Sequence, residues 1–249
     1  MVISAFKPKD EIRTAIPSFV IHAPTLENFK KVLFQAGFIN YIKNSFIVSV
    51  IACGLSMVIA VMAGYALSRY YKQKLVKVSN FAMMLSQMIP GVLLLVPLYM
   101  IMQKFHILET YLCLILAYTT FVIPLCTFMM SSFFDTVPMA LEEAACVDGA
   151  STWKTYWKII FPIMKPMHAT VAVLTALGTW NDVMTPLVIM SGSTGGTTLP
   201  LAQLNFQTQF GTNYNLAFAS YLLALLPILL FYLICQKHIL NGVVNGAVK

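Results

Sequence analysis

Long apolar stretches recur along the whole 249-residue chain, and they constrain its fold more than any other feature. A helix needs about 20 predominantly apolar residues to cross a hydrocarbon core of about 30 Å. Five stretches reach that length without the residue-by-residue alternation of a transmembrane strand, so each predicts a membrane-spanning helix. They cover roughly residues 44–67, 81–102, 111–134, 166–190 and 216–234.

The composition agrees with this all-α, polytopic transmembrane helical bundle. With 59% hydrophobic and only 10% charged residues, the chain has too little polar surface to cover a soluble globule. Its 5 cysteines form no C-x-x-C pair and indicate neither a disulfide framework nor a zinc site. The glycine-rich stretch 191–200 lacks the lysine of a phosphate-binding loop, so we expect no ATP hydrolysis and no enzyme activity from this chain.

Basic residues predict the orientation of the spans. They gather after the first, third and fifth spans, and the positive-inside rule places these three connectors in the cytoplasm. The net charge of +7 then reflects membrane anchoring, and no nucleic-acid partner is expected. The connectors on the other side carry one cation, Lys104. The cytoplasmic cations are Arg69, Lys72, Lys74 and Lys77, then Lys154, Lys158 and Lys165, and finally Lys237 and Lys249.

The beginning of the chain conflicts with this scheme. Residues 1–43 are basic, yet alternation of the spans places them outside, and no signal peptide or earlier span is present to export them. Either this segment is exported against the charge rule or a preceding span is missing. We therefore expect an extracytoplasmic segment (1–43), a transmembrane domain (44–234) with a cytoplasmic loop at 135–165, and a cytoplasmic tail (235–249).

That loop contains the polar stretch EEAACVDGASTWKTYWKIIFPIMKP, which begins at Glu142. Its first half predicts a short helix with carboxylates near its positive end and Gly149 as its stop. A second helix is predicted from Ser151, with one apolar stripe formed by Trp153, Tyr156, Trp157 and Ile160. Two interpretations remain: an amphipathic elbow that joins two spans, or a docking element for a cytoplasmic partner.

The spacing of this loop resembles the EAA signature of ABC importer permeases, E-A-A-x(3)-G-x(9)-I-x-L-P. The matching positions are Glu143-Ala144-Ala145, Gly149, Ile159 and Phe161-Pro162, with phenylalanine in place of leucine. Further stretches, among them VISAFKPKDEI, PTLENFKKVL, AGYALSR, TWND and TTLPLAQ, are similar to carbohydrate-type permeases related to the second maltose permease subunit. The resemblance extends over essentially the whole chain.

The resemblance implies a type I ABC importer permease in a bacterial or archaeal inner membrane. Such permeases usually have one more span ahead of a segment like VISAFKPKDEI, so we expect the first span to be missing here. The implied partners are a second permease subunit in a heterodimer, an ATPase dimer that binds Mg-ATP, and an extracytoplasmic binding protein; this chain itself would bind no cofactor. The residues implied to couple to the ATPase are Glu142, Glu143, Ala144, Ala145, Asp148, Gly149, Ile159 and Pro162.

A transport path is predicted from polar residues inside the spans. Asp182 is the charged residue of the fourth predicted span, and it follows Trp180 and Asn181. An indole, an amide and a carboxylate suit the C–H faces and hydroxyls of a sugar, although helix packing explains the same residues. Gln87, beside the prolines of the second span, is a further candidate.

The resemblance favours a di- or oligosaccharide as the solute, with glycerol phosphate as the alternative. A secondary transporter is the alternative from another class. It would be expected to show several ionisable residues within spans or inverted repeats, and neither is visible in this sequence.

Overall fold

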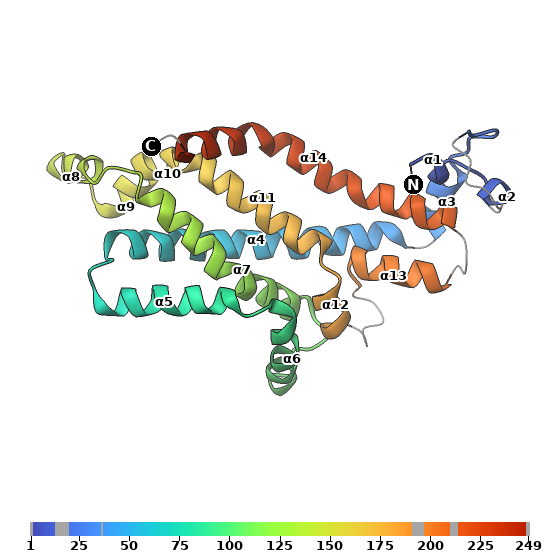
Figure 1. Ribbon diagram of the computed structural model, residues 1–249, viewed down its shortest axis with the longest axis horizontal. Coiled ribbons are helices and arrows are strands. Elements are labelled where there is room, and N and C mark those ends of the chain that lie inside the picture. The colour runs from blue at the N-terminus through green and yellow to red at the C-terminus, as the bar shows by residue number, and fades with distance from the viewer. Residues whose placement is uncertain (1, 13–19, 36, 191–196, 210–213, 248–249) are drawn as a thin grey trace. The chain divides into compact units, whose positions relative to one another are not determined.

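The computed structural model describes residues 2–12, 20–35, 37–190, 197–209 and 214–247, and every regular element in these ranges is a helix (Figure 1). In chain order the helices are α1 (Val2–Ala5), α2 (Lys9–Ile12), α3 (Glu27–Gln35), α4 (Phe38–Arg69), α5 (Lys74–Met88), η1 (Gly91–Leu94), α6 (Leu95–Lys104), α7 (Tyr111–Phe134), α8 (Ala140–Val147), α9 (Thr152–Thr155), η2 (Tyr156–Ile160), α10 (Phe161–Ile163), α11 (Lys165–Asn181), α12 (Met184–Ile189), α13 (Leu199–Gln209) and α14 (Tyr214–Ala247).

Among the described residues, 3 helices are long and apolar enough to cross a membrane unaided. They are α4, α7 and the Tyr214–Gln236 part of α14, and each contains one of the predicted spans. Two bent helix pairs raise the number to as many as 5 if each pair is one span. One pair joins α5 to η1 and α6, and the other joins Thr152–Ile163 to α11 at a bend of 74°. The predicted five spans therefore require both bent pairs.

The second and fourth predicted spans are wrong in one respect, because neither is a continuous helix. The second is interrupted at Ile89, whose φ of −87° and ψ of 120° are extended, since the ring of Pro90 disfavours a helical conformation at the preceding residue. The fourth is interrupted at Asp182 and Val183, between α11 and α12. Pro90 is a sequence signal for a bend in the second span, whereas the apolar sequence of the fourth did not reveal its break.

The contacts within the chain define two units, and the long helices contribute to both. The first unit comprises Met1–Val50, Pro97–Ile115 and Leu177–Phe231. Its core contains Phe38 of α4, Trp180 of α11, Leu199 of α13 and Ala219 of α14. These side chains lie on elements that are far apart in sequence, so the core of this unit is assembled by tertiary contacts.

Within this first unit, the beginning of the chain is attached to α14. The amide of Asn28 donates to the backbone oxygens of Ala5 (2.8 Å) and Lys7 (2.9 Å), and its oxygen accepts from Asn215 at 2.9 Å. Both asparagines are buried, and buried amides are stable only when such partners exist. The predicted N-terminal segment is thus packed against the start of α14 (Figure 1).

The second unit comprises Ile51–Val96, Leu116–Ala176 and Tyr232–Lys249. Its core contains Val61 of α4, Met130 and Phe134 of α7, and Ile160 and Met164 of the polar loop. Helices α4 and α7 approach closely at Gly64, where an added Cβ would lie 2.6 Å from the Cβ of Met130 and 3.0 Å from the backbone nitrogen of Ser131. A residue without a side chain is therefore required at this contact.

We predict that Gly64→Ala lowers the free energy of unfolding by about 1–3 kcal/mol, because the backbones of α4 and α7 must separate. The matched control is Gly54→Ala in the same helix, where an added Cβ meets nothing within 4 Å. Thermal unfolding of the purified subunit in detergent measures both. Equal stability of the two variants would show that the α4–α7 contact tolerates a methyl group.

Candidate functional site

The polar loop begins with α8, whose end has the geometry of a Schellman motif. Gly149 adopts a left-handed φ of +73°, and its N–H donates to the oxygen of Cys146 at 3.0 Å. The N–H of Ala150 donates to the oxygen of Ala145 at 2.9 Å. This pair of bonds satisfies carbonyls that the helix end would otherwise leave free, and it favours glycine at this position. The predicted stop at Gly149 is confirmed.

The second half of the loop begins at Ser151, whose hydroxyl accepts from the N–H of Lys154 at 3.3 Å as a helix N-cap. The helix then widens into the π-helical turn η2, in which the N–H of Phe161 donates to the oxygen of Tyr156. The aromatic residues of the predicted apolar stripe lie together: the ring centroids of Trp153 and Trp157 are 5.7 Å apart, and those of Tyr156 and Trp157 are 5.2 Å apart. Their burial differs along the stripe, because Ile160 is buried in the core and Tyr156 is half-buried, whereas the side chains of Trp153 and Trp157 are exposed.

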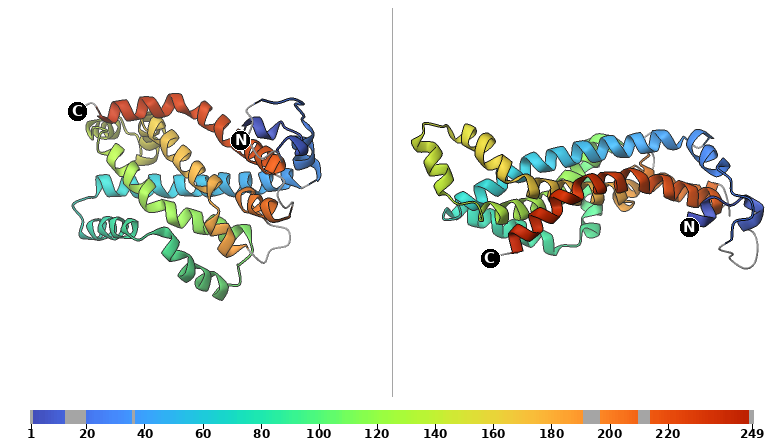
Figure 2. Two further views of the ribbon diagram at one scale, coloured as in Figure 1. Left: turned by 45° about the vertical axis from the view of Figure 1, so that its right-hand side comes forward. Right: turned by 90° about the horizontal axis from the view of Figure 1, so that it is seen from above.

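The predicted coupling residues differ in their exposure to solvent. Glu143, Ala144, Asp148, Gly149 and Pro162 are exposed, whereas Ala145 is buried, and Glu142 and Ile159 are partly buried. Met139, Glu143 and Val147 follow one another at helical spacing, and Val147 is 88% exposed. We call these three residues the α8 face; it combines one carboxylate with two exposed apolar side chains. Figure 2 shows α8 and α9 from two further directions.

Glu142 differs from its neighbour because it is bound within the chain. Its carboxylate accepts from the guanidinium of Arg69 at 2.7 Å and from the hydroxyl of Tyr65 at 2.7 Å. Both partners lie in the last turn of α4. The sequence analysis missed this role, since Arg69 was interpreted as a charge that orients the spans and a separation of 73 residues from Glu142 gives no local signal.

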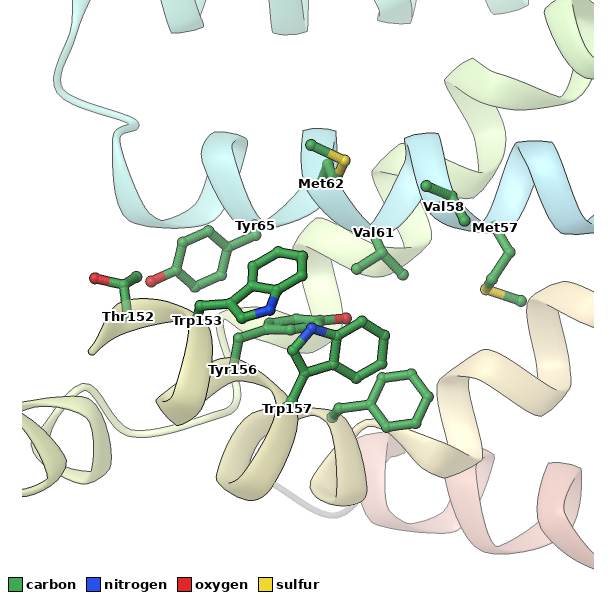
Figure 3. Close-up of a pocket in the computed structure, with 10 residues that line it drawn as sticks. Met57, Val58, Val61, Met62, Tyr65, Thr152, Trp153, Tyr156 and Trp157 are labelled. Atoms are coloured by element: carbon green, nitrogen blue, oxygen red, sulfur yellow. The ribbon is translucent and has the colours of Figure 1, made fainter. Parts of the chain in front are cut away.

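An apolar groove of about 450 Å³ lies between α4 and the second half of the loop (Figure 3). Tyr65 and Val61 come from α4, and the rings of Trp153, Tyr156 and Trp157 face them from α9 and η2. The ring centroids of Tyr65 and Tyr156 are 6.4 Å apart in an edge-to-face arrangement. The remaining lining residues are Met57, Val58, Met62, Thr152 and Phe161.

The residues predicted to line a solute path have different environments. Trp180 is 5% exposed, and its indole N–H donates to the oxygen of Ala224 at 3.1 Å. The amide of Asn181 donates to the oxygen of Leu177 at 2.9 Å. Gln87 is exposed on α5, which belongs to the other unit. Trp180 and Asn181 therefore lie in the first unit, and Gln87 lies in the second.

Asp182 lies in the break between α11 and α12 rather than inside a continuous span. One carboxylate oxygen accepts from the N–H of Met184 at 3.0 Å, and the other accepts from the N–H of Thr185 at 3.3 Å. These two donors belong to the first turn of α12, where backbone N–H groups have no partner within the helix. The carboxylate thus caps the start of α12.

A second cavity, of about 180 Å³, lies in the first unit. Its polar and aromatic lining comes from Trp180, Asn181, Gln203 and Tyr221, and Asp182 does not line it. Gln203 of α13 also donates to the oxygen of Ser220 at 3.4 Å. The sequence analysis missed Gln203 and Tyr221, because neither is adjacent to the polar cluster in sequence.

Apolar helices joined by a polar, capped two-helix loop define a polytopic helical membrane protein. Residues 56–244 match the family model described as the binding-protein-dependent transport system inner membrane component. The chain belongs to this family, because the match covers well over half of its length. The resemblance found in the EAA-type loop is thereby confirmed at the level of the family.

Curated relatives match over the full chain. It is 36% identical to the multiple sugar-binding transport system permease protein MsmG of Streptococcus mutans, covering 100% of this chain and 89% of that protein. It is 32% identical to the diacetylchitobiose uptake system permease protein DasC of Streptomyces coelicolor, covering 100% and 90% of the two chains. It is 31% identical to the arabinooligosaccharides transport system permease protein AraQ of Halalkalibacterium halodurans, covering 100% and 89%.

Solved structures confirm the fold. A chain of a bacterial ABC transporter involved in the import of alginate superposes with a TM-score of 0.79 at 19% identity, covering 95% of this chain and 87% of that chain. A chain of the inward-facing MetNI methionine ABC transporter superposes with a TM-score of 0.61 at 16% identity, covering 82% and 95%. The chain therefore has the helical fold of ABC importer permeases.

We predict that Gly149→Val destabilises the loop by about 1–2 kcal/mol, because a side chain disfavours the left-handed conformation. Gly149→Asn is the matched control, since asparagine tolerates that conformation better. No atom lies within 4 Å of an added Cβ, so the expected difference comes from the backbone and not from a clash. Thermal unfolding and uptake by the assembled importer measure the effect. Equal stability and equal uptake in both variants would show that the left-handed conformation at this position is not required.

We predict that Asp182→Ala costs about 0.5–2 kcal/mol through loss of the α12 cap, and that Asp182→Asn costs less because its amide oxygen still accepts. Thermal unfolding and solute uptake should be measured on both variants. Lost uptake with unchanged stability in Asp182→Asn would instead indicate a contact between this carboxylate and the solute.

Proposed function

We propose that this chain is one permease of a heterodimeric ABC importer, and that it moves an oligosaccharide delivered by an extracytoplasmic binding protein. An ATPase dimer would supply the energy by hydrolysing Mg-ATP, with no cofactor bound by this chain. The observation that carries the proposal is the α8 face. An exposed carboxylate flanked by exposed apolar side chains, on a helix with a fixed end, suits a docking contact with another protein.

In this mechanism the loop is the mechanical contact with the ATPase. Glu143 would pair with a cation in a cleft of the ATPase, while Met139 and Val147 of the α8 face fill apolar parts of that cleft. Gly149 fixes the angle at which α8 meets α9. Closure of the ATPase dimer on nucleotide would then move the loop, and the loop would move the spans between inward-open and outward-open states.

The chemistry of the second cavity supports a sugar as the solute. Its indole, phenol and amide groups match the apolar C–H faces and hydroxyls of a saccharide. No lysine or arginine is among the described residues that line it, which disfavours the phosphate of glycerol phosphate at this cavity. The names of relatives such as MsmG, DasC and AraQ also refer to sugars.

We predict that the assembled importer takes up a neutral oligosaccharide and not glycerol phosphate. Uptake of radiolabelled malto-, chito- and arabino-oligosaccharides, with glycerol 3-phosphate alongside, measures this in cells that contain the complete system. Gln203→Leu should lower uptake of the preferred sugar, because the cavity loses an amide that can hydrogen-bond to a hydroxyl. Uptake of glycerol phosphate alone would overturn the assignment of a sugar.

A second prediction uses a native probe on the coupling loop. Of the 5 cysteines, Cys146 of α8 is the exposed one. Docking of the ATPase over α8 should protect Cys146 from a membrane-impermeant maleimide in inside-out vesicles. Glu143→Lys should restore labelling and reduce co-purification of the ATPase, whereas Lys74→Met, an exposed charge change on α5, should do neither. Full labelling of Cys146 in the intact complex would show that the ATPase binds elsewhere.

A further inference from the structure

We propose that the last turn of α4 is a clamp that holds both halves of the coupling loop, so that the loop and this end of α4 move as one body. The clamp consists of Tyr65, Ser68 and Arg69, with Glu142 as their partner on α8. The two adjacent glutamates then have different tasks: Glu142 binds inside the chain and Glu143 faces the ATPase. The direction of the movement rests on the proposed function, but the clamp itself can be tested without it.

The first attachment is a fully bonded guanidinium. The Nε and Nη2 atoms of Arg69 each lie 2.7 Å from Oε1 of Glu142. Nη2 also donates to the oxygen of Val137 at 3.1 Å, and Nη1 donates to the oxygen of Phe134 at 3.2 Å and to the hydroxyl of Ser68 at 3.4 Å. A guanidinium carries five N–H donors in a planar fork, and these partners account for all of them. A lysine has neither the reach nor the shape for this set.

These contacts join three helices at one point. Phe134 is the last residue of α7, where carbonyl groups lack helical partners and a cation is favourable. Ser68 donates to the carboxylate of Asp135 at 2.5 Å, which adds a second bond between α4 and the residues that follow α7. Arg69 therefore fixes the end of α4 to the end of α7 and to the first turn of α8.

Tyr65 provides the second attachment, one helical turn before Arg69. Its hydroxyl donates to Oε2 of Glu142 at 2.7 Å, so both carboxylate oxygens are occupied by α4. Its ring packs edge-on against Phe134 at 5.5 Å and against Tyr156 of η2 at 6.4 Å. The same residue thus contacts α8 through its hydroxyl and the second half of the loop through its ring. Figure 3 shows Tyr65 in the wall of the groove, beside Trp153 and Tyr156.

The burial of the ion pair makes it costly to separate α8 from α4. The side chains of Arg69 and Glu142 are 8% and 17% exposed, so neither charge could separate from the other without losing most of its stabilisation. Glu143 is one residue further along α8, about 100° around the helix, and it is exposed. A force applied to α8 through Glu143 would therefore reach α4 through Glu142.

A distance measurement tests the clamp directly. Nitroxide labels are placed on the native Cys146 of α8 and on a cysteine replacing the exposed Tyr70 just after α4, with Cys53 and Cys235 changed to alanine. In the reconstituted importer we expect one narrow distance distribution by double electron–electron resonance, unchanged by Mg-ATP with vanadate. The double variant Arg69→Met/Glu142→Leu should broaden this distribution and shift it with nucleotide. An unchanged distribution in the double variant would overturn the clamp.

A double-mutant cycle separates this role from simple stability. Each single change, Arg69→Met or Glu142→Leu, leaves one charge buried without its partner and should reduce the folding equilibrium constant on the order of 100-fold or more. The double variant should recover most of that loss, because apolar residues can replace a buried ion pair. It should still show the broad, nucleotide-dependent distribution. Recovered stability together with a narrow distribution would mean that the pair contributes to folding alone.

Three further variants keep the result interpretable. Arg69→Lys retains the charge but not the planar fork, so it should also broaden the distance distribution. It takes the place of the double variant in this measurement if the double variant assembles poorly. Lys74→Met removes a nearby exposed charge and should change neither the distribution nor the stability. Glu143→Lys should keep the narrow distribution while reducing co-purification of the ATPase. Undiminished co-purification in that variant would contradict the proposed docking face and leave the clamp standing.

Discussion

Every backbone polar group inside a hydrocarbon layer needs a partner from the protein itself, and this requirement governs the architecture of the chain. Continuous helices such as α4 meet it through their own hydrogen bonds. Where a helix is broken, the exposed groups need other partners. At the break after α11, the carboxylate of Asp182 accepts from the first free N–H groups of α12. Asp182 therefore has a local structural role, whereas Trp180 and Asn181 line the cavity of the first unit.

The same requirement applies at the polar loop, where helix ends lie close together. Carbonyls at the end of α8 are bonded through the turn at Gly149, and the carbonyl of Phe134, the last residue of α7, accepts from Arg69. The same arginine side chain also binds the carboxylate of Glu142 on α8. In the proposed importer, these bonds would let the loop transmit a movement to α4. It also leaves Glu143 and Val147 exposed for a partner protein.

Local features of the candidate site could be predicted from the sequence, whereas its long-range contacts could not. The glycine stop, the short helix before it and the start of the second helix at Ser151 depend on residues within a few positions of one another, and all three are found. The aromatic residues of the predicted stripe in the second helix also lie together along one groove. The π-turn at Tyr156–Ile160 was not predicted, because helical periodicity assumes a constant turn.

The sequence by itself determined the all-helical class, the approximate spans and the family, because apolar length and short motifs are local properties. Only the tertiary structure decided that the second and fourth spans are broken and that Glu142 binds Arg69. It also decided that Trp180 and Asn181 share a cavity with Gln203 and Tyr221. These outcomes depend on contacts between residues tens of positions apart. Such contacts are set by helix packing, and packing is a property of the assembled helices rather than of any one segment.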